Sequence, residues 1–295
     1  MLWQRVITAL LLLPLVLGLV FLLPLNLFAA AVAGVLLLAA REWGRFTSAA
    51  VPAPYVVMTG FLIAVLLLWY SAPAFEFWPS FGWPHLVSVA DNLPLFVLAA
   101  SALFWLVSPL LLWWYPERTG WWRQSQIVRQ LLGIVLVLAL WVALVSLRKV
   151  GDLSTDPLKG ALLILFVLLL VWAADIGAYA TGKLFGKHKL APAVSPGKTW
   201  QGFWGGLLLA VVMGHFAAQW MNISSRSDWG LRLLILVTIV ASVVGDLIES
   251  LCKREAGIKD SGTLFPGHGG MLDRIDSLMA AAPVFALGAL LLELR

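Results

Sequence analysis

Long apolar runs, each near the length of a membrane span, restrict most strongly what this chain can fold into. A helix that crosses a bilayer needs about 17–25 mostly apolar residues, and 61% of the chain is hydrophobic, whereas a soluble domain is nearer half. Strands of a membrane barrel would alternate polar and apolar residues over roughly ten positions, and these runs do not alternate. We therefore predict an all-α, polytopic integral membrane protein. About nine transmembrane helices are expected, near residues 5–24, 27–44, 54–70, 94–115, 127–147, 158–181, 200–221, 230–251 and 276–293.

The chain is expected to form a single transmembrane domain over residues 1–295, because no repeat or low-complexity linker divides it. Residues 1–150 offer little beyond hydropathy, whereas 158–293 carry the polar motifs. The apolar run after Arg5 could be a signal peptide, but it has the length of a full span and a second run follows at once, which favours an uncleaved helix. The segment 71–92, rich in Pro and Trp, is predicted to be an interfacial loop.

Charge and cysteine content exclude several other classes of protein. Cys252 is the lone cysteine, so no intrachain disulfide can form, and no Cys/His cluster suggests zinc. The net charge of +5 could suit nucleic acid, but there is no soluble basic domain to bind it. Most of the 20 Lys and Arg residues instead fall on the side of the N-terminus, which predicts that this side is cytoplasmic. The basic loop 148–159, assigned to the outside, is the weak point of this topology.

Residues 246–277 are the one stretch in which the apolar chain becomes densely charged. Asp246, Glu249, Ser250 and Lys253 share one face of a helix at offsets of three, four and seven. An ordinary interpretation is a polar stripe in which Glu249 pairs with Lys253. Asp246, however, lies inside an otherwise apolar helix, where an acid without a partner is costly. This position favours metal binding or a basic partner over a purely structural role.

Two further acids, Asp273 and Asp276, open the last predicted helix on one face. They could simply complement the helix dipole. With Asp246 facing the same side of the membrane, they also make a plausible carboxylate cage. Carboxylate oxygens without soft ligands select cations of the Mg²⁺ type, which complete their shell with water and substrate phosphate. We predict Mg²⁺ on Asp246 and Asp273, with a two-cation site as the alternative.

Basic residues interleaved with these acids suit a polyphosphate beside such a metal. Arg254 can hold phosphate oxygens bidentately, while Lys253 and Lys259 supply point charges. The alternative is an anchor for anionic lipid head groups, against which the interleaved acids argue. The glycines of 266–270 could let backbone amides approach phosphate closely. His268 in that loop is a candidate acid/base group or phosphate contact, but a lone histidine is a weak signal.

A second polar segment, 185–206, contains a Gly-Lys-Thr like the end of a P-loop. Pro192 replaces the upstream glycine of that motif and no strand is expected before it, so a Walker A site is rejected. The turn from Ser195 through Lys198 to Thr199 opens a helix and can still bind an anion, or it can serve only as a helix cap. Upstream, Asp175 is an acid near the end of an apolar helix, and a functional role is favoured because of its cost. The predicted topology places 182–199 and 252–275 on one side of the membrane.

At these residues the chain closely resembles the phosphatidate cytidylyltransferases, or CDP-diacylglycerol synthases. The family pattern Ser-x-x-Lys-Arg, four residues, Lys-Asp, then Pro-Gly-His-Gly-Gly and Asp-Arg-x-Asp runs from Ser250 to Asp276. Asp175-Ile-Gly-Ala-Tyr and Ser195-Pro-Gly-Lys-Thr-Trp also look like family motifs, so the likeness covers at least 172–280. Two departures are Cys252, where a larger apolar residue is usual, and Gln201, where Glu is expected.

The resemblance implies transfer of CMP from CTP to phosphatidic acid, giving CDP-diacylglycerol and pyrophosphate in phospholipid biosynthesis, with Mg²⁺ required. The implied partners are CTP, phosphatidic acid and membrane lipids, with no nucleic acid; a homodimer stays open. The implied location is the bacterial inner membrane, with the site facing the cytoplasm. The implied catalytic residues are Asp246, Asp273, Lys253 and Lys259, and the implied substrate-binding residues are Asp175, Ser195, Lys198, Thr199, Arg254, Asp260, His268, Arg274 and Asp276.

Two rival functions make different demands on the sequence. An ion-coupled transporter would use Asp175 and Asp246 as intramembrane ion sites and would show inverted repeats with broken helices near the midplane. The acids instead fall near one membrane boundary, and no repeat is visible. A CDP-alcohol phosphotransferase requires an Asp-Gly pair in its helix motif, and none occurs in the chain. Acyl-chain preference and the choice between CTP and dCTP are left open.

Overall fold

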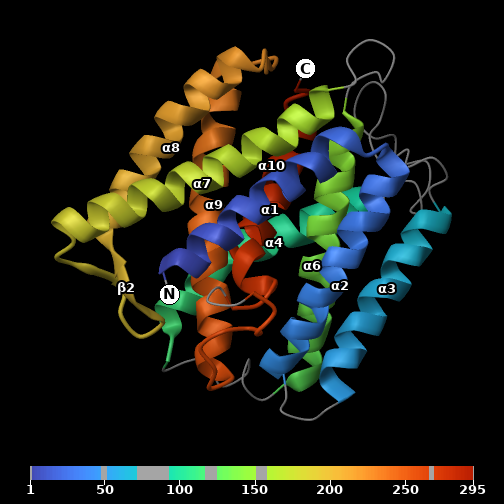
Figure 1. The fold of residues 1–295 in the computed structure, drawn as a ribbon, viewed down its shortest axis with the longest axis horizontal. Helices are drawn as coiled ribbons and strands as arrows, with labels where there is room; N and C mark the ends of the chain where they lie inside the picture. The colour runs from blue at the N-terminus through green and yellow to red at the C-terminus, as the bar shows by residue number, and fades with distance from the viewer. Residues whose placement is uncertain are drawn as a thin grey trace.

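The computed structural model describes residues 2–47, 52–71, 93–116, 125–150, 158–265 and 269–294. Over these ranges the chain forms nine helices and one two-stranded hairpin, as Figure 1 shows. The helices are α1 (Leu2–Leu22), α2 (Leu25–Thr47), α3 (Pro52–Ser71), α4 (Leu93–Trp114), α6 (Gln126–Lys149), α7 (Lys159–Phe185), α8 (Trp200–Trp220), α9 (Asp228–Glu255) and α10 (Leu272–Leu291). The prediction of an all-α fold is confirmed.

Seven of the described helices are long and apolar enough to cross a membrane: α2, α4, α6, α7, α8, α9 and α10. In the same part of the chain, α1 and α3 contain only shorter apolar helices, Leu10–Leu22 and Ala53–Leu68. The polytopic architecture is therefore confirmed, while the number of nine spans is not. The predicted interfacial loop at 71–92 lies, from residue 72 onward, outside the described residues.

Helix α6 lies at the centre of the N-terminal half and packs against α2, α3, α4 and α10 (Figure 1). Its residues from Leu136 to Leu147 are buried on every side. This is expected of a helix that is apolar all round. The indole N–H of Trp141 in this buried stretch donates to the carbonyl of Ala29 on α2, 2.9 Å away. α6 thus ties α2 to the C-terminal half of the bundle.

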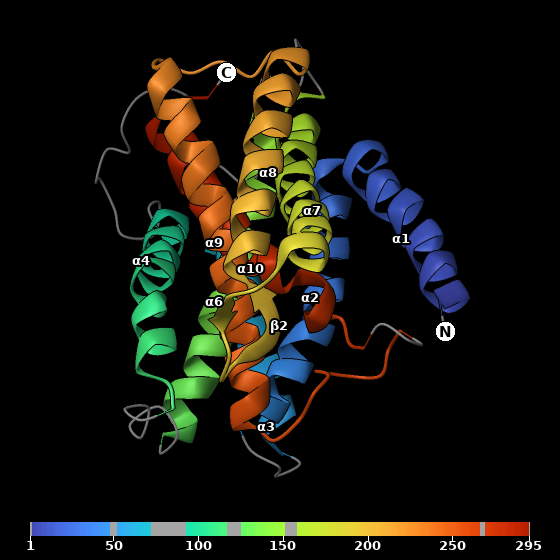
Figure 2. The ribbon, with the colours of Figure 1, turned by 90° about the vertical axis from the view of Figure 1, so that its left-hand side faces the viewer.

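The C-terminal half is arranged around a close crossing of α7 and α8 (Figure 2). Glycines face one another there, Gly177 and Gly182 on α7 against Gly202 and Gly206 on α8, and a Cβ at Gly206 would meet the carbonyl oxygen of Ala174. Small residues allow such close approach between membrane helices. Between the two helices, β1 (Lys189–Ala191) and β2 (Ser195–Thr199) form an antiparallel hairpin, which contacts α9.

Arg148 explains why the basic segment at 148–159 was the weak point of the predicted topology. Its side chain is buried; Nε donates to the carbonyl of Val20 at 3.1 Å and one Nη donates to that of Leu23 at 3.2 Å. The last carbonyls of a helix have no partner within the helix. Arg148 therefore closes the C-terminal end of α1 and should not be counted as a free loop charge.

The Arg148→Met variant is expected to lose about 2–3 kcal/mol of unfolding free energy, because the buried carbonyl of Val20 and the part-buried carbonyl of Leu23 lose a charged donor while the aliphatic stem is kept. Thermal unfolding of the purified protein in detergent measures the loss. Arg226→Met is the matched control: Arg226 is 68% exposed and pairs with Glu293 at 2.8 Å, and such surface pairs contribute at most about 1 kcal/mol. Equal losses in the two variants would contradict this role for Arg148.

Candidate active site

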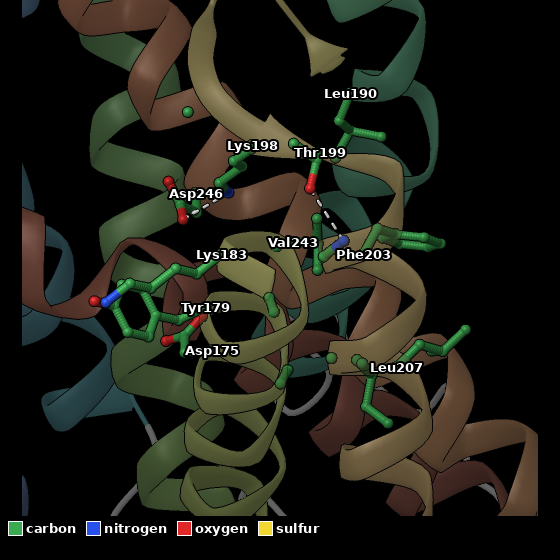
Figure 3. A pocket seen from close by; sticks show the side chains of 17 residues that line it. Asp175, Tyr179, Lys183, Leu190, Lys198, Thr199, Phe203, Leu207, Val243 and Asp246 are labelled. Carbon is green, nitrogen blue, oxygen red and sulfur yellow. Dashed lines mark hydrogen bonds and ion pairs between the residues drawn. The ribbon is translucent and has the colours of Figure 1, made fainter. Parts of the chain in front are cut away.

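A cavity of about 390 Å³ lies between α7, α8, α9 and the hairpin (Figure 3). Its charged rim is formed by Asp175 on α7, Lys198 on β2 and Asp246 on α9. Its interior is mostly apolar. The apolar lining comprises Ala174, Ala178, Gly182, Leu190, Gly197, Gly202, Phe203, Gly206, Leu207, Ile239 and Val243; Tyr179, Lys183 and Thr199 complete the wall. The cavity thus joins a charged rim to an apolar slot.

The charged rim brings together residues that are far apart in the sequence. Lys198 Nζ lies 2.6 Å from Asp246 Oδ2, as Figure 3 shows, and the Ser250 hydroxyl donates to Asp246 Oδ1 at 3.4 Å. Asp175 and Asp276 lie close enough to Asp246 to interact with it electrostatically. The hydrogen bond from Arg254 to the carbonyl of Val194 brings residues of 182–199 and 252–275 into contact. That they form one site stays a prediction.

Asp273 belongs to a different network, centred on Lys253. Lys253 pairs with Glu249 one turn earlier in α9, as the ordinary interpretation predicted, and it also donates to Asp273 Oδ1 at 2.8 Å. The other oxygen, Asp273 Oδ2, accepts bonds from the amides of Ser261 at 2.9 Å and Gly270 at 2.8 Å. Asp246 and Asp273 are therefore held by separate partners. That both bind a metal stays a prediction.

The remaining described residues that were predicted to bind substrate do not line the cavity. Arg254 is exposed, and its Nε donates to the carbonyl of Val194 at 3.1 Å, so this base fastens the hairpin to α9. Lys259, Asp260 and Arg274 are exposed, and Ser195 is half-buried in β2. His268 lies outside the described residues.

The segment expected to be a turn without a preceding strand is itself β2, paired with β1, so that expectation was wrong. Thr199 ends the strand and caps α8: its hydroxyl accepts from the amide of Gly202 at 3.1 Å. Gln201 binds the segment that precedes β1: its Oε1 accepts from the amides of Lys187 at 3.1 Å and His188 at 3.2 Å. Pairing of strands this short depends on such tertiary contacts, which local sequence does not reveal.

The sequence analysis missed a buried acid in α2, Glu42, which is 6% exposed. Its Oε2 accepts from the hydroxyl of Ser261 at 2.9 Å and from the amide of Leu272 at 2.8 Å. Residues 1–150 were expected to contribute little, yet this one contacts the charged segment. A signal was present, since Glu42 lies at the end of an apolar helix, where a buried acid is costly, although the neighbouring Arg41 and Arg45 make it look like part of an ordinary charged helix end.

The side chains on the rim have the chemistry that a hard divalent cation requires. The donors are carboxylate oxygens without soft ligands. Asp175 and Asp276 lie within electrostatic range of Asp246 and Lys198. Within the described residues, no group of three or more His, Cys, Asp and Glu side chains is placed to hold a metal alone. Mg²⁺ usually needs only one or two carboxylates, with water and substrate phosphate completing the shell, so the rim fits this ion.

Comparison with known proteins covers nearly the whole chain. Residues 3–292 match the model of the cytidylyltransferase family. A phosphatidate cytidylyltransferase of Haemophilus influenzae is 38% identical over 97% of this chain and 98% of its own length, and one of Pseudomonas aeruginosa is 39% identical over 97% and 96%. One from Staphylococcus epidermidis is 50% identical over 43% of this chain and 48% of its own. The chain therefore belongs to the cytidylyltransferase family.

Proposed function

We propose that this protein transfers CMP from CTP to phosphatidic acid, giving CDP-diacylglycerol and pyrophosphate. The observation that carries the proposal is the cavity that joins the charged rim at Lys198 and Asp246 to an apolar slot between α7, α8 and α9. A nucleotide and a diacyl lipid need these two environments side by side. The names of the relatives that match over nearly the full length support the same reaction.

In this reaction an oxygen of the lipid phosphate forms a bond to the α-phosphorus of CTP, and the bond from that phosphorus to the bridging oxygen of pyrophosphate breaks. The nucleophile is already ionised at neutral pH, so no strong general base is needed. The protein contributes mainly position and charge neutralisation. In this proposal Lys198 on the rim binds phosphate oxygens, and the exposed bases Arg254, Lys259 and Arg274 remain predicted phosphate contacts.

The apolar slot gives the lipid a route from the bilayer. Its lining includes the small residues Gly202 and Gly206 of α8 and Ala178 of α7. Ile239 and Val243 line it from α9. The outer surface of α8 exposes Trp204 and Leu208, as a helix in contact with lipid does. In this proposal the acyl chains lie along the slot while the phosphate reaches the rim.

Mg²⁺ is proposed as the cofactor, held by Asp246 together with phosphate oxygens of CTP. When bound, it would neutralise the charge of the phosphates. Asp175 and Asp276, within electrostatic range of Asp246, supply further carboxyl groups near the same point. Asp273 remains a predicted ligand, although in this structure both its oxygens already accept hydrogen bonds. A second cation and a homodimer stay open alternatives.

The proposed location is the bacterial cytoplasmic membrane, with the site facing the cytoplasm. The Arg254–Val194 hydrogen bond joins the hairpin to the last turn of α9, from which the segment toward α10 continues, so in this proposal both segments lie on one side. The positive-inside rule makes that side cytoplasmic, because most of the basic residues lie with it.

Labelled CTP tests the reaction directly. Purified protein should move label from the α-phosphate of CTP into lipid when phosphatidic acid and Mg²⁺ are both present, whereas label from the γ-phosphate should leave as pyrophosphate. Replacing phosphatidic acid by diacylglycerol removes the attacking phosphate and should abolish the product, as should chelation of the metal. Lipid labelling that needs no phosphatidic acid, or that carries the γ-label, would refute the proposed reaction, and activity in full after chelation would refute the Mg²⁺ requirement.

A further inference from the structure

Glu42 joins the N-terminal half of the protein to the densely charged segment 246–277. It lies on α2, and its Oε2 accepts two bonds from residues more than two hundred positions away, Ser261 and Leu272. One turn further along α2, Arg45 Nη1 donates to the carbonyl of Ser261 at 3.2 Å. Ser261 is completely buried. Side chain and backbone of this residue are therefore both held by α2.

The backbone of the α9–α10 segment closes around the Glu42 carboxylate from two sides. A Cβ placed on Gly262 would overlap Glu42 Oε1, and one placed on Gly270 would overlap Glu42 Oε2. Glycine permits so close an approach of backbone to a charged group. The segment is thus shaped to receive this carboxylate and leaves no room for a side chain at either glycine.

The bond from Leu272 to Glu42 also supplies a helix cap that the local sequence lacks. α10 begins at Leu272, and its N-cap residue, Met271, makes no side-chain cap bond. The first amides of a helix need acceptors, and a negative charge there is favoured by the helix dipole. Glu42 provides both from a distant helix. It thereby fixes the start of α10, where Asp273 is the second residue.

The hydroxyl of Ser261 links Glu42 to Asp273. Ser261 Oγ lies 2.9 Å from Glu42 Oε2 and 2.9 Å from Asp273 Oδ2. Asp273 in turn holds Lys253 of α9. Glu42 does not line the cavity, whose wall comes from α7, α8, α9 and the hairpin. The contacts that link Glu42 to Asp273 and Lys253 therefore run through Ser261 and the first turn of α10.

We infer that Glu42 is a positioning residue for the proposed reaction: through Ser261 and Leu272 it sets the orientation of Asp273 and Lys253. The inference rests on the proposed function. A residue of this kind alters turnover without altering substrate affinity, because the groups it orients stabilise charge as the reaction proceeds while its own side chain stays clear of the cavity.

Glu42→Gln keeps the size of the side chain but removes the charge at the start of α10. We expect kcat for CTP-dependent lipid labelling to fall by about ten- to a hundredfold, as a small misplacement of reacting groups can cause. The KM values for CTP and phosphatidic acid should change less than about threefold, because the side chain stays clear of the cavity. Hydrogen exchange, followed by mass spectrometry, should speed up in peptides covering 258–272, and peptides of α6 and α7 should keep the wild-type rate.

Two buried serines provide a matched pair for the hydroxyl. Ser261 and Ser101 are both completely buried, but Ser101 Oγ has no hydrogen-bond partner among the described residues. Ser261→Ala should reproduce the loss in kcat, whereas Ser101→Ala should keep wild-type activity. Glu42→Gln and Ser261→Ala combined should lose less than the product of the single losses, because both remove the same contact.

The possible failures of this experiment are distinct. If the wild-type protein makes no lipid product, the proposed function fails. If the wild type is active and Glu42→Gln, folded by its thermal transition, keeps full kcat, the inference fails. It also fails if exchange rises equally throughout the protein, because Glu42 would then support the fold as a whole, or if activity falls only through KM.

Discussion

Asp246→Asn is expected to lower the rate of CTP-dependent lipid labelling by about a hundred- to a thousandfold, the loss typical when one electrostatic contact to a transition state is removed. Asp246 is the central acid of the charged rim, since it pairs with Lys198 and interacts electrostatically with Asp175 and Asp276. The substitution keeps the shape of the side chain. It removes the charge that the proposed Mg²⁺ requires and that orients Lys198.

The fold should survive this change. The side chains of Asp246 and Lys198 are 28% and 27% exposed, so water can solvate Lys198 when its partner is neutral. Asp228→Asn is the matched control, because it makes the same substitution on the same helix, at an exposed position in its first turn. The control should retain wild-type activity. Wild-type rates in the Asp246→Asn variant at saturating CTP and Mg²⁺ would remove Asp246 from the site.

Lys253→Met is expected to have the largest effect on stability, a loss of about 3–5 kcal/mol, because breaking a buried ion pair leaves charge without compensation. Here one ammonium serves two carboxylates, Glu249 and Asp273, and all three side chains are largely buried. Met fills a similar volume without the charge. The thermal transition in detergent should fall accordingly, and lipid labelling should be lost with it because Asp273 loses its partner on α9.

Lys187→Met is the stability control, because Lys187 is exposed and the same atoms are exchanged. Its thermal transition should match that of the wild type. Adding Glu249→Gln to Lys253→Met should recover part of the lost stability, since only one carboxylate then lacks its cation. If Lys253→Met unfolds at the wild-type temperature, or if the second change lowers stability further, the pairing does not hold this region together.

The cost of an intramembrane acid was the most reliable guide to the site. It singled out Asp175 and Asp246, which the structure places on the rim of one cavity. The same rule applies to Glu42, which lies outside the family motifs of the second half of the chain. Local spacing also identified the Glu249–Lys253 pair correctly, because residues four apart in a helix are neighbours whatever the tertiary structure.

Other assignments required distances that no local pattern contains. Asp246 and Asp273 were grouped as one carboxylate cage, whereas the structure gives them separate cationic partners, Lys198 and Lys253. Arg254 was expected to bind phosphate, and in this structure it fastens the hairpin to α9. Arg148 was counted as a loop charge, and it caps α1. In each case the partner lies on another element, so its identity depends on how helices pack.

The sequence by itself determined the helical, membrane-spanning architecture and the place of the charged segment, because hydropathy and helix periodicity act over one or two turns. It also carried the motifs that identify the family. The tertiary structure alone decided which base neutralises which acid, and it alone showed Glu42 at the start of α10. A buried charge must find its partner in space, and here these partners are up to 230 residues apart in the chain.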